Sequence, residues 1–165
     1  MITVVVDDLA SLRVDAVLRP AGESLEPLAA AVSRLDQLAG QRFADQHRVS
    51  SPLEAGAAVV TGGGDLVAPF VIHVVIRDSA SPVARTTVRR ALVSAWQRAT
   101  EWGLGRIGAP LVGADAGQLS LEESATLLVE TFPPPGAADN PAELCIVVER
   151  QEDRDAVEAI VRRTA

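Results

Sequence analysis

The chain has 165 residues, 48% of them apolar and 22% charged, and its formal net charge is −7. This composition suits one folded domain over 1–165 rather than a disordered chain. The single cysteine, Cys145, excludes a disulfide framework and a cysteine-based zinc site. The negative charge argues against broad nucleic-acid binding, and no apolar run in the sequence is long enough to span a bilayer. We therefore expect a cytoplasmic protein with neither a nucleic-acid nor a membrane partner.

The first half of the chain predicts strands on both sides of one amphipathic helix. Short apolar or β-branched runs predict strands at 2–6, 16–18, 57–60 and 70–76. Apolar residues recur at helical spacing from Leu25 to Leu38, which predicts a helix that Gly40 ends. Residues 41–51 are polar and are expected to form a surface loop, and the three glycines at 62–64 are expected to form a turn.

The second half alternates helices with strands. Apolar spacing predicts a long helix from Ala84 to Gly103, and Ser120 with Glu123 forms a capping-box pattern that starts a second helix. The remaining elements are two strands and one helix, at 106–110, 144–148 and 153–163. Strands that alternate with helices predict an α/β fold with helices packed on both faces of one sheet.

The sequence offers few groups for catalysis or metal binding. His73 lies inside the predicted strand 70–76 and is expected to be a hydrogen-bonded core residue, whereas His47 lies in the predicted loop. No group of residues has the spacing of a metal site, so neither a metal ion nor a cofactor is expected. The glycines at 62–64 lack the Gly-Lys-Ser/Thr element that a phosphate-binding P-loop requires.

Two strand ends are candidates for ligand binding. The loop at 112–117 follows a strand and precedes a capped helix, where open α/β sheets usually bind ligands. Its small residues would let backbone amides approach an anion, but Asp115 would repel a phosphate, and an ordinary connecting loop is the alternative. At the end of the first strand, Asp7 or Asp8 could accept a hydrogen bond from an exocyclic amino group, or could simply cap a turn.

Taken in order, these segments resemble a macro domain, the ADP-ribose-binding module. The resemblance rests on the opening segments 2–9 and 14–18, on the strands at 56–61 and 70–73, and on 103–110 with the helix start at 121–125. It implies a three-layer α/β/α sandwich with a mixed, mostly parallel central sheet. It also implies a small nucleotide ligand such as ADP-ribose.

The resemblance also implies site residues. Asp8 would hold the adenine amino group, with a backbone contact from Leu9, and Val148 replaces an aromatic residue that often packs on adenine. Gly22 replaces an asparagine that reaches the distal ribose, and residues 113–117 correspond to the second phosphate loop. The implied ligand-binding residues are Asp8, Leu9, Gly22, Gly113, Ala114, Asp115, Ala116, Gly117 and Val148.

The departures from the family pattern leave three hypotheses open. Pro27, Leu28, Ala29 and Ala30 stand where the family has a glycine-rich run, so side chains would narrow the diphosphate site. The polar residues that would orient a water molecule are missing, so we expect a binding module for ADP-ribose or a related nucleotide with little or no catalysis. One alternative is a scaffold that has lost the pocket and acts through its surface or as a homo-oligomer. The other is an ADP-ribosyl hydrolase or ADP-ribose 1″-phosphate phosphatase.

Overall fold

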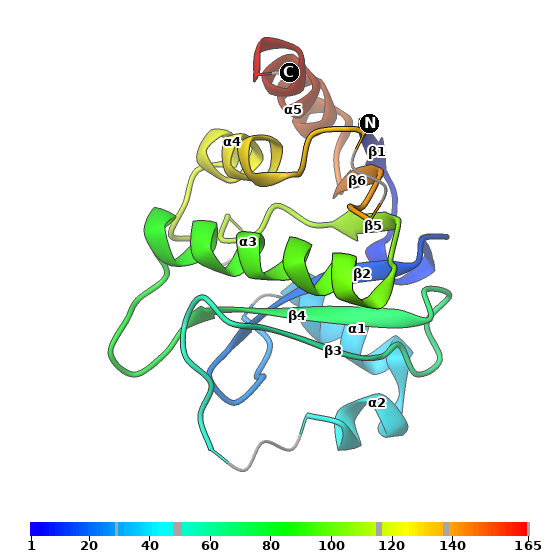
Figure 1. The fold of residues 1–165 in the computed structure, drawn as a ribbon, viewed down its shortest axis with the longest axis vertical. Helices are drawn as coiled ribbons and strands as arrows, with labels where there is room; N and C mark the ends of the chain where they lie inside the picture. The colour runs from blue at the N-terminus through cyan, green and yellow to red at the C-terminus, as the bar shows by residue number, and fades with distance from the viewer. Residues whose placement is uncertain (29, 48–50, 115–116, 137–138, 165) are drawn as a thin grey trace.

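A six-stranded sheet forms the centre of the computed structural model, which describes residues 1–28, 30–47, 51–114, 117–136 and 139–164 (Figure 1). The strands are β1 (Ile2–Val6), β2 (Ala16–Gly22), β3 (Ala58–Gly62), β4 (Phe70–Arg77), β5 (Arg106–Ala109) and β6 (Glu143–Val148). Their order is β1-β6-β5-β2-β4-β3; β3 runs antiparallel to β4, and the other neighbours are parallel. The predicted mixed, mostly parallel sheet is thus confirmed.

Helices cover both faces of the sheet. In Figure 1, helix α1 (Ala30–Ala39) lies behind the sheet and α3 (Arg85–Trp102) lies in front of it. The short helix α2 (Gln41–Asp45) contacts α1, whereas α4 (Leu121–Thr131) contacts α3 and α5 (Gln151–Thr164) contacts α4. Leu35 of α1 and Phe43 of α2 pack on Val17 and Val71 of the sheet, and the larger apolar core fills the α3 side. The three-layer α/β/α sandwich is confirmed.

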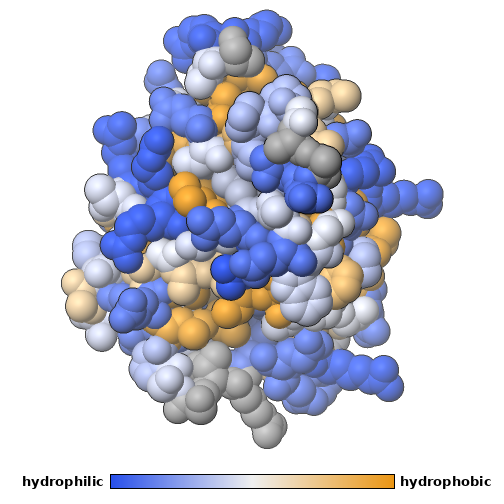
Figure 2. Space-filling view, viewed as in Figure 1, coloured by the Kyte–Doolittle hydropathy of each residue, from blue (hydrophilic) through white to orange (hydrophobic). Residues whose placement is uncertain are grey.

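The surface on the α3 side is mostly hydrophilic. Figure 2 shows hydrophobic residues on this face only as groups interspersed with hydrophilic ones. No helix in the described part of the chain is long and apolar enough to cross a membrane.

The predicted helix from Leu25 begins too early, because residues 22–28 form a compact turn instead. Leu25 has a φ of 60°, which no helix accommodates, and Ala21 forms a β-bridge with Pro27. The Gly22 N–H donates to the Glu26 carbonyl oxygen at 3.1 Å. Leu25 is nevertheless buried. The apolar spacing at the start of this segment therefore arises because the turn is buried, not because it is helical.

A helix and a strand end also differ from the prediction. The predicted loop 41–51 contains α2, which forms because Phe43 is fully buried against the sheet. Strand β2 continues through Arg19 and Pro20 to Gly22, past the predicted end at residue 18. Beyond Val17 this strand pairs with β4 but not with β5. Its edge toward β5 is therefore unpaired there, so Pro20, which has no N–H group, costs no hydrogen bond on that edge.

Local signals of capping and turning are confirmed. The Ser120 hydroxyl accepts the Glu123 N–H at 3.0 Å, the Glu123 carboxylate accepts the Ser120 N–H at 3.1 Å, and α4 begins there. Gly103 ends α3 in the left-handed conformation, with a φ of 66°. Of the three glycines predicted to form a turn, Gly62 is the last residue of β3, and Gly63 and Gly64 begin the turn before β4, where the Gly63 N–H donates to the Pro69 carbonyl oxygen.

Candidate functional site

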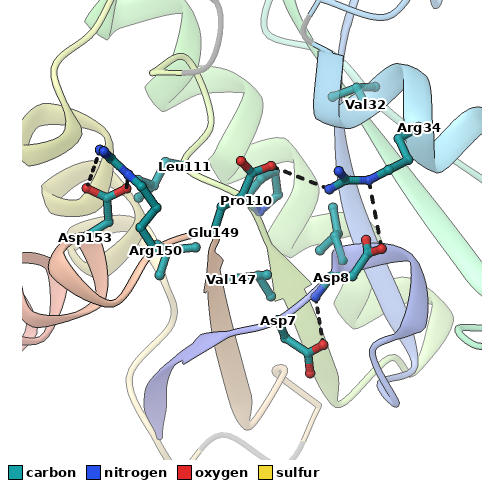
Figure 3. Close-up of a pocket in the computed structure, with 12 residues that line it drawn as sticks. Asp7, Asp8, Val32, Arg34, Pro110, Leu111, Val147, Glu149, Arg150 and Asp153 are labelled. Carbon is teal, nitrogen blue, oxygen red and sulfur yellow. Dashed lines mark hydrogen bonds and ion pairs between the residues drawn. The ribbon is translucent and has the colours of Figure 1, made fainter.

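A cavity of about 260 Å³ lies where β1, β5 and β6 end (Figure 3). These three strands are parallel neighbours, so their carboxyl ends meet at one edge of the sheet, which is the usual ligand site of open α/β sheets. The turn after β1, helix α1 and the start of α5 complete its walls. The residues that line it are Asp7, Asp8, Leu9, Val32, Arg34, Pro110, Leu111, Val147, Val148, Glu149, Arg150 and Asp153.

Asp8 caps a turn, which is one of the two roles that the sequence left open. Its Oδ1 accepts the Ala10 N–H at 3.1 Å and caps the short 3₁₀ helix Leu9–Ser11, while its own N–H donates to Oδ1 of Asp7 at 2.7 Å. The second carboxylate oxygen, Oδ2, is directed toward Arg34, at 3.9 Å from its Nε atom. One oxygen therefore fixes the turn, and the other is available at the cavity for a hydrogen-bond donor.

Arg34 reaches from α1 across the cavity toward two carboxylates. Figure 3 shows its guanidinium between Asp8 and Glu149, and its Nη2 lies 3.5 Å from Oε1 of Glu149. The Arg34 side chain is 52% exposed, and both ion pairs are long, so each contributes at most about 1 kcal/mol. A ligand could displace this bridge at little cost.

Arg150 marks the opposite side of the cavity. It pairs with Asp153 at 3.2 Å and with Glu152 at 2.8 Å, and the hydrogen bond to Asp153 raises the pKa of Arg150. Both of the cavity's guanidiniums thus already have carboxylate partners. Because the lining also includes Asp7, Asp8, Glu149 and Asp153, its carboxylates outnumber its guanidiniums. The charge favours a ligand group that donates hydrogen bonds over an anionic one.

Aliphatic side chains form the walls between these charges. Val148 is 4% exposed at the end of β6, beside Val147, and Val32 of α1 is 1% exposed. Together with Leu9 and Leu111 they supply the apolar part of the cavity lining. The lining is thus about half polar and half apolar, which suits a group with both apolar surface and hydrogen-bond donors. Of the predicted site residues, Asp8, Leu9 and Val148 therefore lie together here.

Gly22 is not among the residues that line this cavity. A Cβ atom at Gly22 would clash with the Glu26 carboxylate, which accepts the Ser24 N–H at 3.1 Å. The carboxylate of Glu26 thus occupies the space that a side chain at position 22 would take. Leu28, from the same turn, packs against the main apolar core.

Gly113, Ala114 and Gly117, the described residues of the predicted phosphate loop, are likewise not among the residues that line the cavity. Gly113 has a φ of 88°, and the Ala114 N–H donates to the Leu111 carbonyl oxygen at 3.1 Å. The Gly117 N–H donates to the Ala114 carbonyl oxygen at 2.9 Å. These two amides therefore close turns within the loop. The predicted site residues Asp115 and Ala116 lie outside the described residues.

An ion pair with a fully buried guanidinium holds α1 against the sheet. Arg19 of β2 is fully buried, and its Nε and Nη2 atoms donate to the two carboxylate oxygens of Asp36, each at 2.7 Å. This two-bond geometry fixes orientation as well as distance. Because Val32 and Arg34 lie on the same helix as Asp36, the pair also sets the position of the α1 wall of the cavity.

His73 of β4 extends this network and is a buried core histidine, as predicted. Its Nδ1 lies 3.3 Å from Nη1 of Arg19, and its Nε2 lies 2.8 Å from Oγ1 of Thr61. A guanidinium can only donate, so Nδ1 accepts and the proton is on Nε2. Burial first, then the charge of Arg19 and the neighbouring His47, hold the pKa of His73 well below its usual value.

Several lining residues were missed at the sequence level. Glu149 and Arg150 directly follow the predicted strand 144–148, so the rule that ligands bind at strand ends could have identified them. Arg34 gives no such signal, because it lies on the polar face of an amphipathic helix, where charged residues are ordinary. Within the described ranges, no three histidine, cysteine or acidic residues are grouped to hold a metal ion.

Known proteins share this fold and sequence pattern. The family model of the macro domain matches residues 23–128, which is more than half of the chain. An uncharacterized protein of Aeropyrum pernix is 29% identical over 126 residues, which is 76% of this chain and 67% of that protein. The chain spans about a third of the mycobacterial relatives that it also matches, since the alignment covers 34% of them.

Solved structures agree with the family match. The Trypanosoma brucei macrodomain in complex with ADP-ribose superimposes with a TM-score of 0.84 at 19% identity, over 97% of this chain and 68% of that one. A single-residue variant of the Oceanobacillus iheyensis macrodomain gives a TM-score of 0.83 at 16% identity, over 97% and 86%. Family model and fold therefore agree, and this chain belongs to the macro domain family.

Proposed function

We propose that this protein binds ADP-ribose or a related adenine nucleotide, with the adenosine part in the cavity beside Asp8. The observation that carries this proposal is the cavity itself, which lies at the ends of parallel strands in a macro fold and has a carboxylate oxygen of Asp8 at its edge. The Trypanosoma brucei relative is described in complex with ADP-ribose, and also with ADP.

The chemistry of the lining suits an adenine base. Val32, Val148 and Leu111 offer apolar contact to a planar ring. Oδ2 of Asp8 would accept a hydrogen bond from the exocyclic amino group, while Oδ1 keeps its bond to the Ala10 N–H. Recognition of the base thus leaves the turn after β1 intact.

The size and surroundings of the cavity favour the adenosine end of the ligand. Its volume of about 260 Å³ is below the roughly 300–1,000 Å³ of pockets that enclose a drug-sized ligand. The Glu26 carboxylate beside Gly22 would repel a diphosphate that approached the turn at 22–28. We therefore propose that adenosine retains most of the affinity of ADP-ribose.

The same narrowing favours a second candidate function, a protein-interaction scaffold on the macro fold. Leu28 stands where the family pattern has a glycine-rich run, and the Glu26 carboxylate fills the space beside Gly22, where the family pattern has an asparagine that reaches the distal ribose. Hydrolysis is not proposed, because Gly22 and the residues at 27–30 bring no polar side chain that could orient a water molecule.

Titration calorimetry with ADP-ribose and with adenosine tests the binding proposal. We expect both ligands to bind, with dissociation constants within about tenfold of each other. Asp8→Asn should weaken both by about tenfold, or about 1.4 kcal/mol, because its amide oxygen still caps the turn while its NH₂ group faces the ligand's amino group.

The control variant is Asp45→Asn, which changes an exposed carboxylate of α2 away from the cavity lining. It should leave both affinities unchanged. No binding of either ligand at millimolar concentration would refute the nucleotide proposal and favour the scaffold. Equal affinity of the wild type and Asp8→Asn would remove Asp8 from the site.

A further inference from the structure

The cavity has no aromatic side chain to cover a bound base. The chain contains three Phe, two Trp and no Tyr. Phe43 stacks on His73 in the α1 layer, Phe70 lies against Trp102, and the remaining two aromatic residues contact each other. None of these lines the cavity, whose apolar walls are aliphatic. The site therefore lacks the flat, polarisable surface on which a purine usually stacks.

Arg34 is placed to supply such a surface. Its guanidinium is planar, lies between Asp8 and Glu149 at the cavity, and comes from the helix that also contributes Val32 to the lining (Figure 3). Planar guanidinium groups stack on aromatic rings more readily than ammonium groups do. Arg34 and Val32 both line the cavity, so a ring bound there lies within reach of the guanidinium.

The ion pairs of Arg34 fit this role. The distance of 3.9 Å to Asp8 is the longer of the two, and both partners are exposed, so a ligand amino group could take over Oδ2 of Asp8. Glu149, at 3.5 Å, would remain the counter-ion of the guanidinium. The carboxylate released by Arg34 is the one that the base needs, so base binding and guanidinium displacement would occur together.

We propose that Arg34 is the base-stacking residue of this cavity: when an adenine nucleotide binds, the Arg34 guanidinium leaves Asp8, stays paired with Glu149 and lies flat on the purine ring. This inference rests on the proposed nucleotide function and names a specificity-determining residue within it. Arg34 does not take part in a bond-breaking step; it acts by contact with the ligand.

The experiment compares Arg34→Ala, Arg34→Lys and wild type by titration calorimetry with adenosine, which has no phosphate. Arg34→Ala should weaken adenosine binding by about tenfold, because the stacked cation is lost. Arg34→Lys keeps the charge but not the planar group, and should lose most of that affinity as well. ADP-ribose should lose affinity by the same factor.

A matched control is Arg89→Ala on α3. Arg89 is exposed to the same 52% as Arg34, pairs with one carboxylate, Glu130, and does not line the cavity. It should leave adenosine binding unchanged. Thermal unfolding of all three variants should match that of the wild type within a few degrees, because each removes only exposed ion pairs.

Each alternative gives a distinct result. Unchanged adenosine binding by Arg34→Ala would overturn the inference. Tighter binding would also overturn it, and would mean that Arg34 competes with the ligand for Asp8. Full affinity in Arg34→Lys would show that charge rather than stacking matters, and loss for ADP-ribose alone would assign Arg34 to the phosphates; both overturn it. These results leave nucleotide binding itself intact, whereas a wild type that binds neither ligand refutes the proposed function together with this inference.

Discussion

Asp36→Ala should destabilise the fold by about 3–5 kcal/mol, because it leaves the buried guanidinium of Arg19 without its carboxylate. Arg19 is 0% exposed, and two of its N–H groups lose acceptors that lie at 2.7 Å. A hydrogen bond to a charged group contributes about 1.5–3 kcal/mol, so two such bonds give about 3–6 kcal/mol. The Asp36 side chain is 22% exposed, so water can enter the vacated space, and we expect the lower part of that range.

Urea unfolding followed by circular dichroism measures this effect. A loss of about 3 kcal/mol also lowers the melting temperature by roughly 6–12 °C in a chain of this size. The control is Glu130→Ala, which removes the carboxylate of an exposed pair with Arg89 and should cost less than about 1 kcal/mol. A cost of Asp36→Ala as small as that of Glu130→Ala would refute the view that Arg19 is shielded from water.

The other predictions concern acid stability, capping and loop geometry. The pKa values of His73 and His47 are lowered in the folded protein, so the unfolded chain binds more protons near pH 6.5. The free energy of unfolding should therefore fall as the pH decreases below about 6.5. The fall should be at most about 1.4 kcal/mol per pH unit for each histidine. Urea unfolding at several pH values should show a shallower slope for His73→Gln, and an unchanged slope would contradict this. Ser120→Ala removes the acceptor of the Glu123 N–H and should cost about 1 kcal/mol in urea unfolding, whereas Ser120→Asp should retain most of the stability. Gly113→Ala should lower the melting temperature, since this residue has a φ of 88° and a Cβ would lie 2.8 Å from a leucine side chain; equal melting temperatures would mean that the loop adjusts freely.

Elements governed by local chemistry could be predicted from the sequence. The run of β-branched residues in β4 formed a central strand and buried His73, because such side chains pack on both faces of a pleated sheet. Ser120 begins α4 and Gly103 ends α3 where the sequence predicts, because capping depends on a few neighbouring residues. The resemblance of several segments, taken in order, to the macro domain indicated the family that the family model then showed.

The turn at 22–28 shows where local patterns fail. Its apolar residues follow helical spacing, yet Leu25 is buried by long-range packing against the sheet, with a positive φ that spacing cannot reveal. The occupation of the space beside Gly22 by Glu26 is likewise a consequence of this turn. The sequence shows that position 22 has no side chain, whereas only the fold shows that the Glu26 carboxylate fills the space beside it.

The sequence by itself determined the strands, the capped helices and the presence of a carboxylate at the end of β1. Only the tertiary structure decided that Asp8, Arg34 and Glu149 share one cavity, and that Arg19 finds Asp36 inside the protein. The physical reason is distance along the chain: periodicity and capping act over a few residues, whereas these charges come from separate elements that meet only when the sheet is assembled and α1 is packed on it.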